Sequence, residues 1–279
     1  EVKIDKQLLM MTEMLSNLPF KLITDSRSLA YAIKLPSRSI GLSSSKGESD
    51  FMPRGKQSQG KCAYCSKEIA KGSVNKHLAT CAERKQAIAI KKKKKGTSET
   101  LYHLRIQDAY TPDFWLNLEV RGSATLDNID GYLRAIWLEC CGHMSQFSVG
   151  GWRGEEISTK RKVSDIFQAG VELTHIYDFG TSSETLIKFV EMREGKPTTN
   201  KPIALMVRNL LPPSECIECK EAALFLCLEC LHDLNVWGTL CDRHLKQHEH
   251  QDNYGDPLPL VNSPRLGMCG YDGPAEPPY

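Results

Sequence analysis

Cysteine and histidine recur in close pairs between residues 216 and 250, and this spacing constrains the fold more than any other feature. The four pairs are Cys216/Cys219, Cys227/Cys230, Cys241/His244 and His248/His250. One zinc ion takes four ligands at tetrahedral angles, so eight candidates imply two ions. The gap of seven residues between the first two pairs argues against their closing around one ion. We therefore predict that the first and third pairs bind one ion, and that the second and fourth pairs bind the other.

The same spacing bears on function. Thiolate-rich zinc sites are usually closed, whereas a catalytic zinc needs an open coordination position, so the sequence favours a structural role. The pattern resembles B-box-type and related cross-brace zinc domains, which mostly serve protein contacts. That resemblance implies an unknown protein partner. Cys269 could replace His248 or His250 as a ligand.

A second group with metal-ligand spacing lies earlier in the chain and consists of Cys62, Cys65, His77 and Cys81. The first two residues form a C-x2-C turn, and the last two are spaced to share one face of a helix. Ile69 and Val74 lie where a small ββα zinc finger places its core residues. A fold of this size needs its metal, so we predict one zinc ion here.

The finger is poorly equipped to read a base sequence. Counted back from His77, the base-contacting positions of a ββα finger fall on about Ala70, Ser73 and Lys76. Alanine offers no hydrogen bond, Gly72 weakens the helix at this point, and one finger covers only about three base pairs. We expect no specific recognition from it.

Charge is distributed unevenly along the chain. The net charge is only +2, yet residues 54–95 carry thirteen Lys and Arg against Glu68 and Glu83, a net +11 that leaves −9 elsewhere. Basic side chains bind phosphates without reading sequence. We therefore expect non-specific affinity for DNA or RNA, the alternative being a solvated lysine tether. The candidate residues are Lys76, Arg84, Lys85, Lys91, Lys92, Lys93, Lys94 and Lys95.

The cysteine content and the hydropathy of the chain indicate its cellular location. Eleven cysteines, most of them in metal-ligand spacing, occur in a chain whose first residues lack the apolar centre of a signal peptide. No apolar run approaches the roughly 18 residues of a membrane helix. The sequence predicts a cytoplasmic protein without a membrane partner.

Periodicity predicts an α+β fold with a central, mostly antiparallel sheet, one main helix and two small zinc-stabilised modules. A helix capped by Thr125 carries Ile129, Leu133 and Ile136, and strands are expected at 102–107, 114–120, 144–149, 172–179, 186–192 and 203–207. The expected organisation is a helix and short strands in 1–36, a flexible linker in 37–60, the finger and basic helix in 61–96, the central domain in 100–212, the cross-brace module in 213–253, and a tail in 254–279 with a disordered end.

The central domain contains, in this order, Leu104-Arg-Ile, Pro112, Trp115, Thr125-Leu126, Ile136-Trp137, His143, Phe147, Lys162-Val-Ser-Asp-Ile and Ile176-Tyr-Asp-Phe-Gly180. Over roughly residues 100–195 this pattern resembles the plasmid pRiA4b ORF-3-like family. The resemblance implies an α+β fold and an association with plasmids or other mobile elements, with no settled activity.

One departure from that family concerns possible chemistry. Its Tyr-Asp-Phe-Gly stretch usually continues with Asp, then Trp and His, whereas this chain continues with Thr181-Ser-Ser-Glu-Thr185. Asp178, His143 and His175 remain as weak catalytic candidates, and each has a structural alternative, such as Asp178 capping a turn. We therefore expect a non-enzymatic adaptor; the alternative is a hydrolase or nuclease that uses Asp178 and His143.

Overall fold

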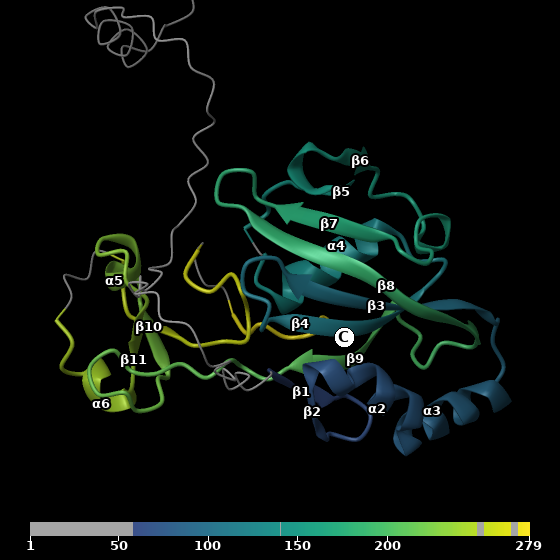
Figure 1. Ribbon diagram of the computed structural model, residues 1–279, viewed down its shortest axis with the longest axis horizontal. Coiled ribbons are helices and arrows are strands. Elements are labelled where there is room, and N and C mark those ends of the chain that lie inside the picture. Colours follow the sequence, from purple (N-terminus) through teal and green to yellow (C-terminus); the bar gives the residue numbers. More distant parts are fainter. Residues whose placement is uncertain (1–57, 140, 250–253, 269–272) are drawn as a thin grey trace, which may run out of the picture. The chain divides into compact units, whose positions relative to one another are not determined.

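The computed structural model describes residues 58–139, 141–249, 254–268 and 273–279 (Figure 1). Of the two units into which the chain divides, Glu1–Met52 and Pro53–Tyr279, all described residues belong to the second. The helix and short strands predicted in 1–36 and most of the linker predicted in 37–60 lie outside the described residues. So do Cys140, His250 and Cys269.

A nine-stranded sheet forms the centre of the second unit (Figure 1). Its order is β2-β1-β9-β4-β3-β8-β7-β5-β6, and every neighbouring pair is antiparallel. All six strands predicted from the sequence are present, and the large antiparallel sheet with few helices confirms the α+β class. The strands are β1 (Gln59–Cys62), β2 (Glu68–Ala70), β3 (Glu99–Asp108), β4 (Trp115–Arg121), β5 (Ser145–Val149), β6 (Glu155–Ile157), β7 (Glu172–Tyr177), β8 (Ser183–Gly195) and β9 (Ile203–Asn209).

The main helix, α4 (Leu126–Ile136), packs against one face of the sheet. Thr125 caps it as predicted, because the Thr125 N–H donates to Asn128 Oδ1 in a capping box. The apolar stripe of α4 is fully buried against alternate strand residues such as Leu104 and Phe147. Burial of each such side chain contributes about 1.5–3 kcal/mol, so this contact forms the principal core.

The remaining helices are α2 (Val74–Thr80), α3 (Ala82–Lys93), α5 (Leu228–His232) and α6 (Asp242–Leu245), with 3-10 turns η1 (Lys71–Ser73), η2 (Gly151–Arg153) and η3 (Val163–Asp165). Of these helices, α3 has 12 residues and the others have seven or fewer. In the part of the chain that the structure describes, none has the length and apolar character needed to cross a membrane.

The hairpin of the finger is part of the large sheet, although the sequence suggested a separate module. Strand β1 pairs with β2 on one side and with β9 on the other. It begins at Gln59, so the predicted linker ends slightly earlier than residue 60. A Cβ atom on Gly60 would lie 2.4 Å from the Trp115 ring and 2.5 Å from Arg208 O, so only glycine fits this approach of β1 to β9.

The C-terminal module has a small antiparallel sheet of its own, in the order β11-β10-β12. Its strands are β10 (Phe225–Cys227), β11 (Gly238–Leu240) and β12 (Leu258–Pro259). Its buried cluster consists of four cysteines and Leu240. The module therefore has very little apolar core.

Residues 258–268, which we call the strap, connect this module to the large sheet. The strap starts in β12, and further along Asn262 bonds with Asn209 and Ser263 Oγ donates to Trp137 O. The end of the chain is also ordered, contrary to the expectation of a disordered end. Ala275 is buried, and Tyr279 packs edge-on against Tyr132.

Candidate metal centres and neighbouring polar sites

The finger cluster brings together all four of its predicted ligands. The sulfur atoms of Cys62, Cys65 and Cys81 and a ring nitrogen of His77 lie within 4.8 Å of one another. Cys62 ends β1, Cys65 lies in the following turn, His77 lies in α2, and Cys81 directly follows that helix. The Cys65 Sγ–His77 Nε2 distance is 3.5 Å. Tetrahedral zinc, with Zn–S about 2.3 Å and Zn–N about 2.0 Å, places sulfur and nitrogen about 3.6 Å apart, so the donors fit zinc.

The finger cluster is supported by the large sheet. Ile69 and Val74 are buried where the finger pattern placed them, together with Trp115, Met206 and Val207. The Trp115 indole N–H donates to Ser58 Oγ at 2.9 Å, just before β1 begins. The ligands are thus held by strand pairing and apolar packing as well as by any metal.

The Cys216 cluster consists of Cys216, Cys219, Cys241 and His244. Cys216 Sγ lies 3.4 Å and Cys241 Sγ 3.5 Å from His244 Nδ1, and Cys219 Sγ lies 3.8 Å from Cys241 Sγ. Two sulfur ligands of tetrahedral zinc are about 3.8 Å apart, so these spacings fit as well. The grouping joins the first and third pairs, as expected for a cross-brace.

The backbone around the Cys216 cluster favours a thiolate. Burial raises the pKa of Cys216, but backbone N–H groups of Cys241, Glu218 and Cys219 lower it more, to about 6. A thiolate is the form that binds metal, so these N–H groups favour the ligand form of Cys216.

The Cys227 cluster consists of Cys227, Cys230 and His248. It joins the second pair with the first member of the fourth pair; the other member, His250, lies outside the described residues. Cys230 Sγ is 3.1 Å from His248 Nε2. A Cβ atom on Gly238 would lie 2.3 Å from Cys230 Cβ, so β11 passes close against the cluster.

The predicted phosphate-binding residues fall into two groups: the lysines, which are mostly exposed, and Arg84, which is not. Lys76, Lys85 and Lys92 to Lys95 are exposed, and Lys91 is half-buried. Lys196 Nζ donates to the carbonyls of Lys92 and Lys94, at the end of α3, where a cation is favourable. The lysine run therefore starts from a helix end that is fixed to the β8 side of the fold.

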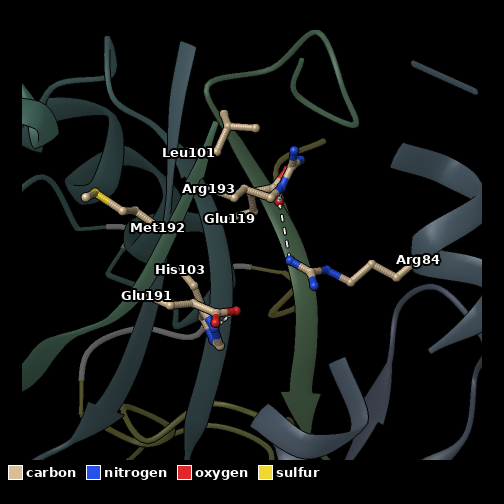
Figure 2. Close-up of a pocket in the computed structure, with 7 residues that line it drawn as sticks. All are labelled: Arg84, Leu101, His103, Glu119, Glu191, Met192 and Arg193. Atoms are coloured by element: carbon tan, nitrogen blue, oxygen red, sulfur yellow. Dashed lines mark hydrogen bonds and ion pairs between the residues drawn. The ribbon is translucent and has the colours of Figure 1, made fainter. Parts of the chain in front are cut away.

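Arg84 does not belong with the exposed lysines. Its guanidinium points toward the sheet, donates to Leu78 O at 3.1 Å and lies 3.8 Å from buried Glu119, which also binds Arg193 (Figure 2). The sequence could not give this orientation because Glu119 is 35 residues away. The adjacent cavity, bordered by His103 and Glu191, has a volume of about 10 Å³, room for a single water.

Asp178 and His143 lie together, with Nδ1 and Oδ2 3.6 Å apart. Asp178 is nevertheless engaged in structure. Its Oδ1 accepts the N–H groups of Gly180 and Thr181, which is the turn-capping alternative, and its Oδ2 accepts Arg265 Nη2 at 2.7 Å. Burial would raise the pKa of Asp178, but these donors hold it below its usual value.

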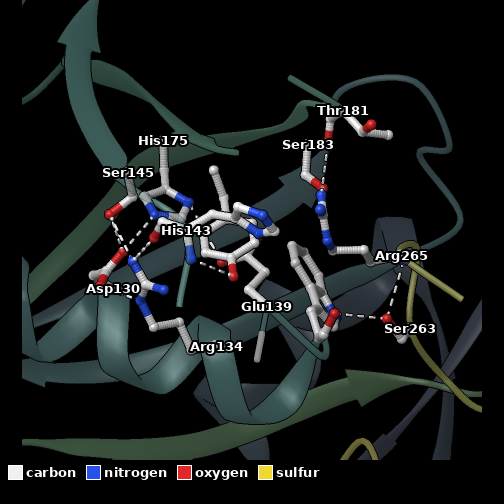
Figure 3. Close-up of polar contacts among 12 residues, drawn as sticks. Asp130, Arg134, Glu139, His143, Ser145, His175, Thr181, Ser183, Ser263 and Arg265 are labelled. Carbon is white, nitrogen blue, oxygen red and sulfur yellow. Dashed lines mark hydrogen bonds and ion pairs between the residues drawn. The ribbon is translucent and has the colours of Figure 1, made fainter. Parts of the chain in front are cut away.

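Arg265 of the strap is the residue that sequence reasoning missed here. Its Nη1 also donates to Thr181 O at 2.9 Å and to Ser183 Oγ at 2.6 Å, and its Cζ lies 4.8 Å from the Tyr177 ring centre (Figure 3). The Arg265 side chain is 1% exposed. The strap therefore closes the space around the candidate catalytic aspartate.

Arg134 Nη2 donates to His143 O at 3.0 Å and so links the Asp178 site to a second network, which contains the buried His175 (Figure 3). Its Nε2 bonds with Asp130 Oδ1 at 2.9 Å, and its Nδ1 lies 4.0 Å from Glu139 Oε2. Arg134 and Ser145 also donate to Asp130. Burial opposes the charge on Asp130, but these donors outweigh it and keep its pKa far below the usual value. The i,i+4 pair Asp130/Arg134 was visible in the sequence; its histidine partner, 45 residues away, was not.

No protein-family model and no curated protein matches this chain. Among solved structures it is similar to a protein of unknown function, MM3350, from Methanosarcina mazei Go1. That likeness has 23% sequence identity and a TM-score of 0.33, and it covers 38% of this chain and 67% of the other. At this level it carries no conclusion about function.

Proposed function

We propose that this protein is a zinc-stabilised, non-enzymatic adaptor with a non-specific affinity for nucleic acid. In this proposal the finger cluster and the Cys216 and Cys227 clusters each hold one structural zinc ion, and the C-terminal module and the sheet offer surfaces to a protein partner. An association with plasmids or other mobile elements is part of the proposal through the family resemblance alone.

The donor spacing supports the zinc assignment. Three sulfur–nitrogen distances of 3.4 to 3.5 Å and one sulfur–sulfur distance of 3.8 Å agree with tetrahedral coordination at two clusters. Four unrelated side chains would not be expected to agree with that geometry twice. When bound, zinc would supply cross-links that the small cores lack.

The exposed lysines support the nucleic-acid part. Five consecutive lysines follow the apolar half of α3, and four of them are exposed. Such a run can neutralise phosphates but presents no set of donors matched to base edges, so sequence preference is not expected.

The enzyme alternative rests on the 3.6 Å approach of His143 to Asp178. Asp178 accepts structural hydrogen bonds from Gly180, Thr181 and Arg265, and these donors hold its pKa below the usual value, so its carboxylate is a weak general base. We therefore prefer the adaptor.

Metal analysis of the purified full chain tests the zinc proposal. Three zinc ions per chain are expected, one for each cluster. Two ions would remove the Cys227 site from the proposal, and no zinc after purification without chelator would overturn it.

Salt-dependent binding tests the nucleic-acid part. We expect the full chain to bind arbitrary duplex DNA at low salt, with a slope of log affinity against log salt near −0.9 for each phosphate neutralised. Substituting Lys91 to Lys95 with Gln should flatten that slope by up to about 4. Arg84→Gln and Lys220→Gln serve as matched controls and should leave it unchanged. Absence of binding at low salt would contradict this part.

A further inference from the structure

Three exposed aromatic side chains meet at one end of the large sheet. Tyr110 is 68%, Phe179 43% and Trp152 42% exposed, and they come from three separate loops. The Trp152 and Phe179 rings contact each other edge to face at 5.5 Å. Tyr110 Oη and Trp152 Nε1 both donate to Glu184 Oε1. We call these four residues the aromatic–acidic patch.

Each aromatic side chain stands on a rigid loop. Asp108 Oδ1 accepts the N–H groups of Tyr110 and Thr111, which fixes the first loop. Asp178, at φ 63°, fixes the Phe179 turn through its own accepted bonds. Exposed rings that are already immobilised lose little entropy on binding, as in protein contact sites, where Tyr and Trp are enriched.

Of the three loops, the one that carries Trp152 is held most tightly. Ser148 Oγ donates to Gly151 O at 2.7 Å, and the Gly154 N–H donates to the same carbonyl. A Cβ atom on Gly154 would lie 1.7 Å from Val149 O, so glycine is required there. The position of Trp152 is therefore fixed by the backbone.

Strand register places a second carboxylate on the same face. Glu156 lies opposite Ser148, Ser148 opposite Thr174, and Thr174 opposite Leu186, which is two residues from Glu184. Directly opposite residues share a face, so Glu156 and Glu184 both lie on the face that bears Trp152. That face is opposite α4, which covers Phe147 and Leu173.

Cations on this part of the sheet include Arg153, in the Trp152 loop, Lys71, which donates to Gln107, and Lys188. Lys188 follows Glu184 by four residues of β8, about 14 Å at 3.4 Å per residue, and it pairs with Glu172. This separation exceeds the Debye length of about 8 Å at physiological salt, so Lys188 is screened from Glu184.

We propose that the aromatic–acidic patch binds a peptide segment of a partner protein that carries arginine. A guanidinium stacks on aromatic rings and pairs with carboxylates. Glu184 can accept it because a carboxylate has about four acceptor sites, of which Tyr110 and Trp152 use two. A phosphate would meet the Glu184 carboxylate here, so the aromatic–acidic patch favours a guanidinium over a nucleic-acid backbone. The inference deepens the adaptor proposal, on whose protein-binding half it rests.

The test is fluorescence anisotropy of the full chain with a labelled eight-residue peptide that alternates Arg and Ser. A Glu/Ser peptide is the control ligand. We expect binding of the arginine peptide, and at least a tenfold weakening by Trp152→Ala and by Glu184→Gln. Trp237→Ala, an equally exposed tryptophan, and Glu221→Gln, an exposed glutamate, are matched controls and should change the affinity less than twofold.

Several outcomes would overturn the inference: equal affinity for both peptides, no binding, or equal effects of patch and control variants. Loss of self-association in Trp152→Ala, without a change in peptide binding, would assign the patch to a second copy instead. Zinc content and DNA affinity are measured on the same variants and should not change. A failure of the zinc or nucleic-acid proposals is thereby distinguished from a failure of this one.

Discussion

The two cysteine-rich regions hold their candidate ligands in different ways. In the finger, Cys62 ends a strand that pairs with β9 of the large sheet, and Trp115 and Met206 complete the buried cluster. In the C-terminal module the buried cluster is four cysteines and Leu240, and the strands have two or three residues each. The finger can therefore keep much of its hairpin without metal, whereas the module lacks the apolar core to do so.

The two regions would therefore depend on metal for their stability to different degrees. Apolar packing contributes only where side chains such as Trp115 leave water, and the module buries few of them. In the zinc proposal, metal coordination would then be the main source of its folding energy. The strap adds a polar connection to the large sheet through Arg265.

The largest effect is expected from Cys216→Ser. Removing one ligand of the Cys216 cluster should abolish a contribution on the order of 10 kcal/mol, typical of structural zinc. The module should then unfold, with loss of zinc and rapid proteolytic cleavage within 213–253, while 100–212 stays protected. Zinc content and limited proteolysis measure both effects.

Cys141→Ser is the matched control for this substitution because Cys141 lies outside all three clusters. It should leave zinc content and cleavage unchanged. If Cys216→Ser retained its zinc and its protection, the contrast between the two regions would be lost.

Trp115→Ala should weaken the support of the finger by the sheet. Trp115 is fully buried, so truncation should lower the free energy of unfolding by about 3–5 kcal/mol. Amide exchange in β1 should accelerate, yet the ligands remain and zinc should still bind. Denaturant unfolding and hydrogen exchange test this, with the exposed Trp237→Ala expected to change stability by less than about 0.5 kcal/mol. Unchanged exchange in β1 would show that metal alone holds the hairpin.

The sequence predicted the parts of these regions whose signals are local. Thr125 marked the start of α4, ligand spacing marked the Cys/His groups, and apolar alternation marked six strands. Pairing between strands that lie far apart in the sequence produced no such local signal. Strand β1 is four residues with a glycine, and nothing near Gly60 indicates β9 as its partner.

The sequence also did not predict the orientation of single charged side chains. Arg84 stands among lysines yet faces Glu119, and Arg265 faces Asp178, 87 residues away. The strap carries no apolar period that would mark it as packed. Its contacts depend on the tertiary position of the sheet end, which no local pattern encodes.

Arg265→Lys tests the connection between the strap and the sheet. A lysine keeps the charge but loses the fork that reaches Asp178, Thr181 and Ser183 together, so a loss of about 1–3 kcal/mol is expected. Thermal unfolding of the zinc-loaded chain measures it. Arg153→Lys, at an exposed arginine, is the control. Equal stability of both variants would mean that the strap is held by its backbone bonds alone.

The smallest effect is expected from a substitution at Glu139. This residue lies two positions after Trp137, whose carbonyl accepts the Ser263 hydroxyl of the strap. Burial raises the pKa of Glu139. The folded state then binds more protons than the unfolded state, so stability falls as pH rises from about 4.3 through the raised pKa. Glu139→Gln removes this dependence and should make the stability profile between pH 5 and pH 8 flatter than that of the wild type. Comparing the variant with the wild type at each pH cancels the proton linkage of the zinc ligands. A profile parallel to the wild type would show that Glu139 is already ionised at pH 5, stabilised by His175 and Arg134 more strongly than burial opposes it.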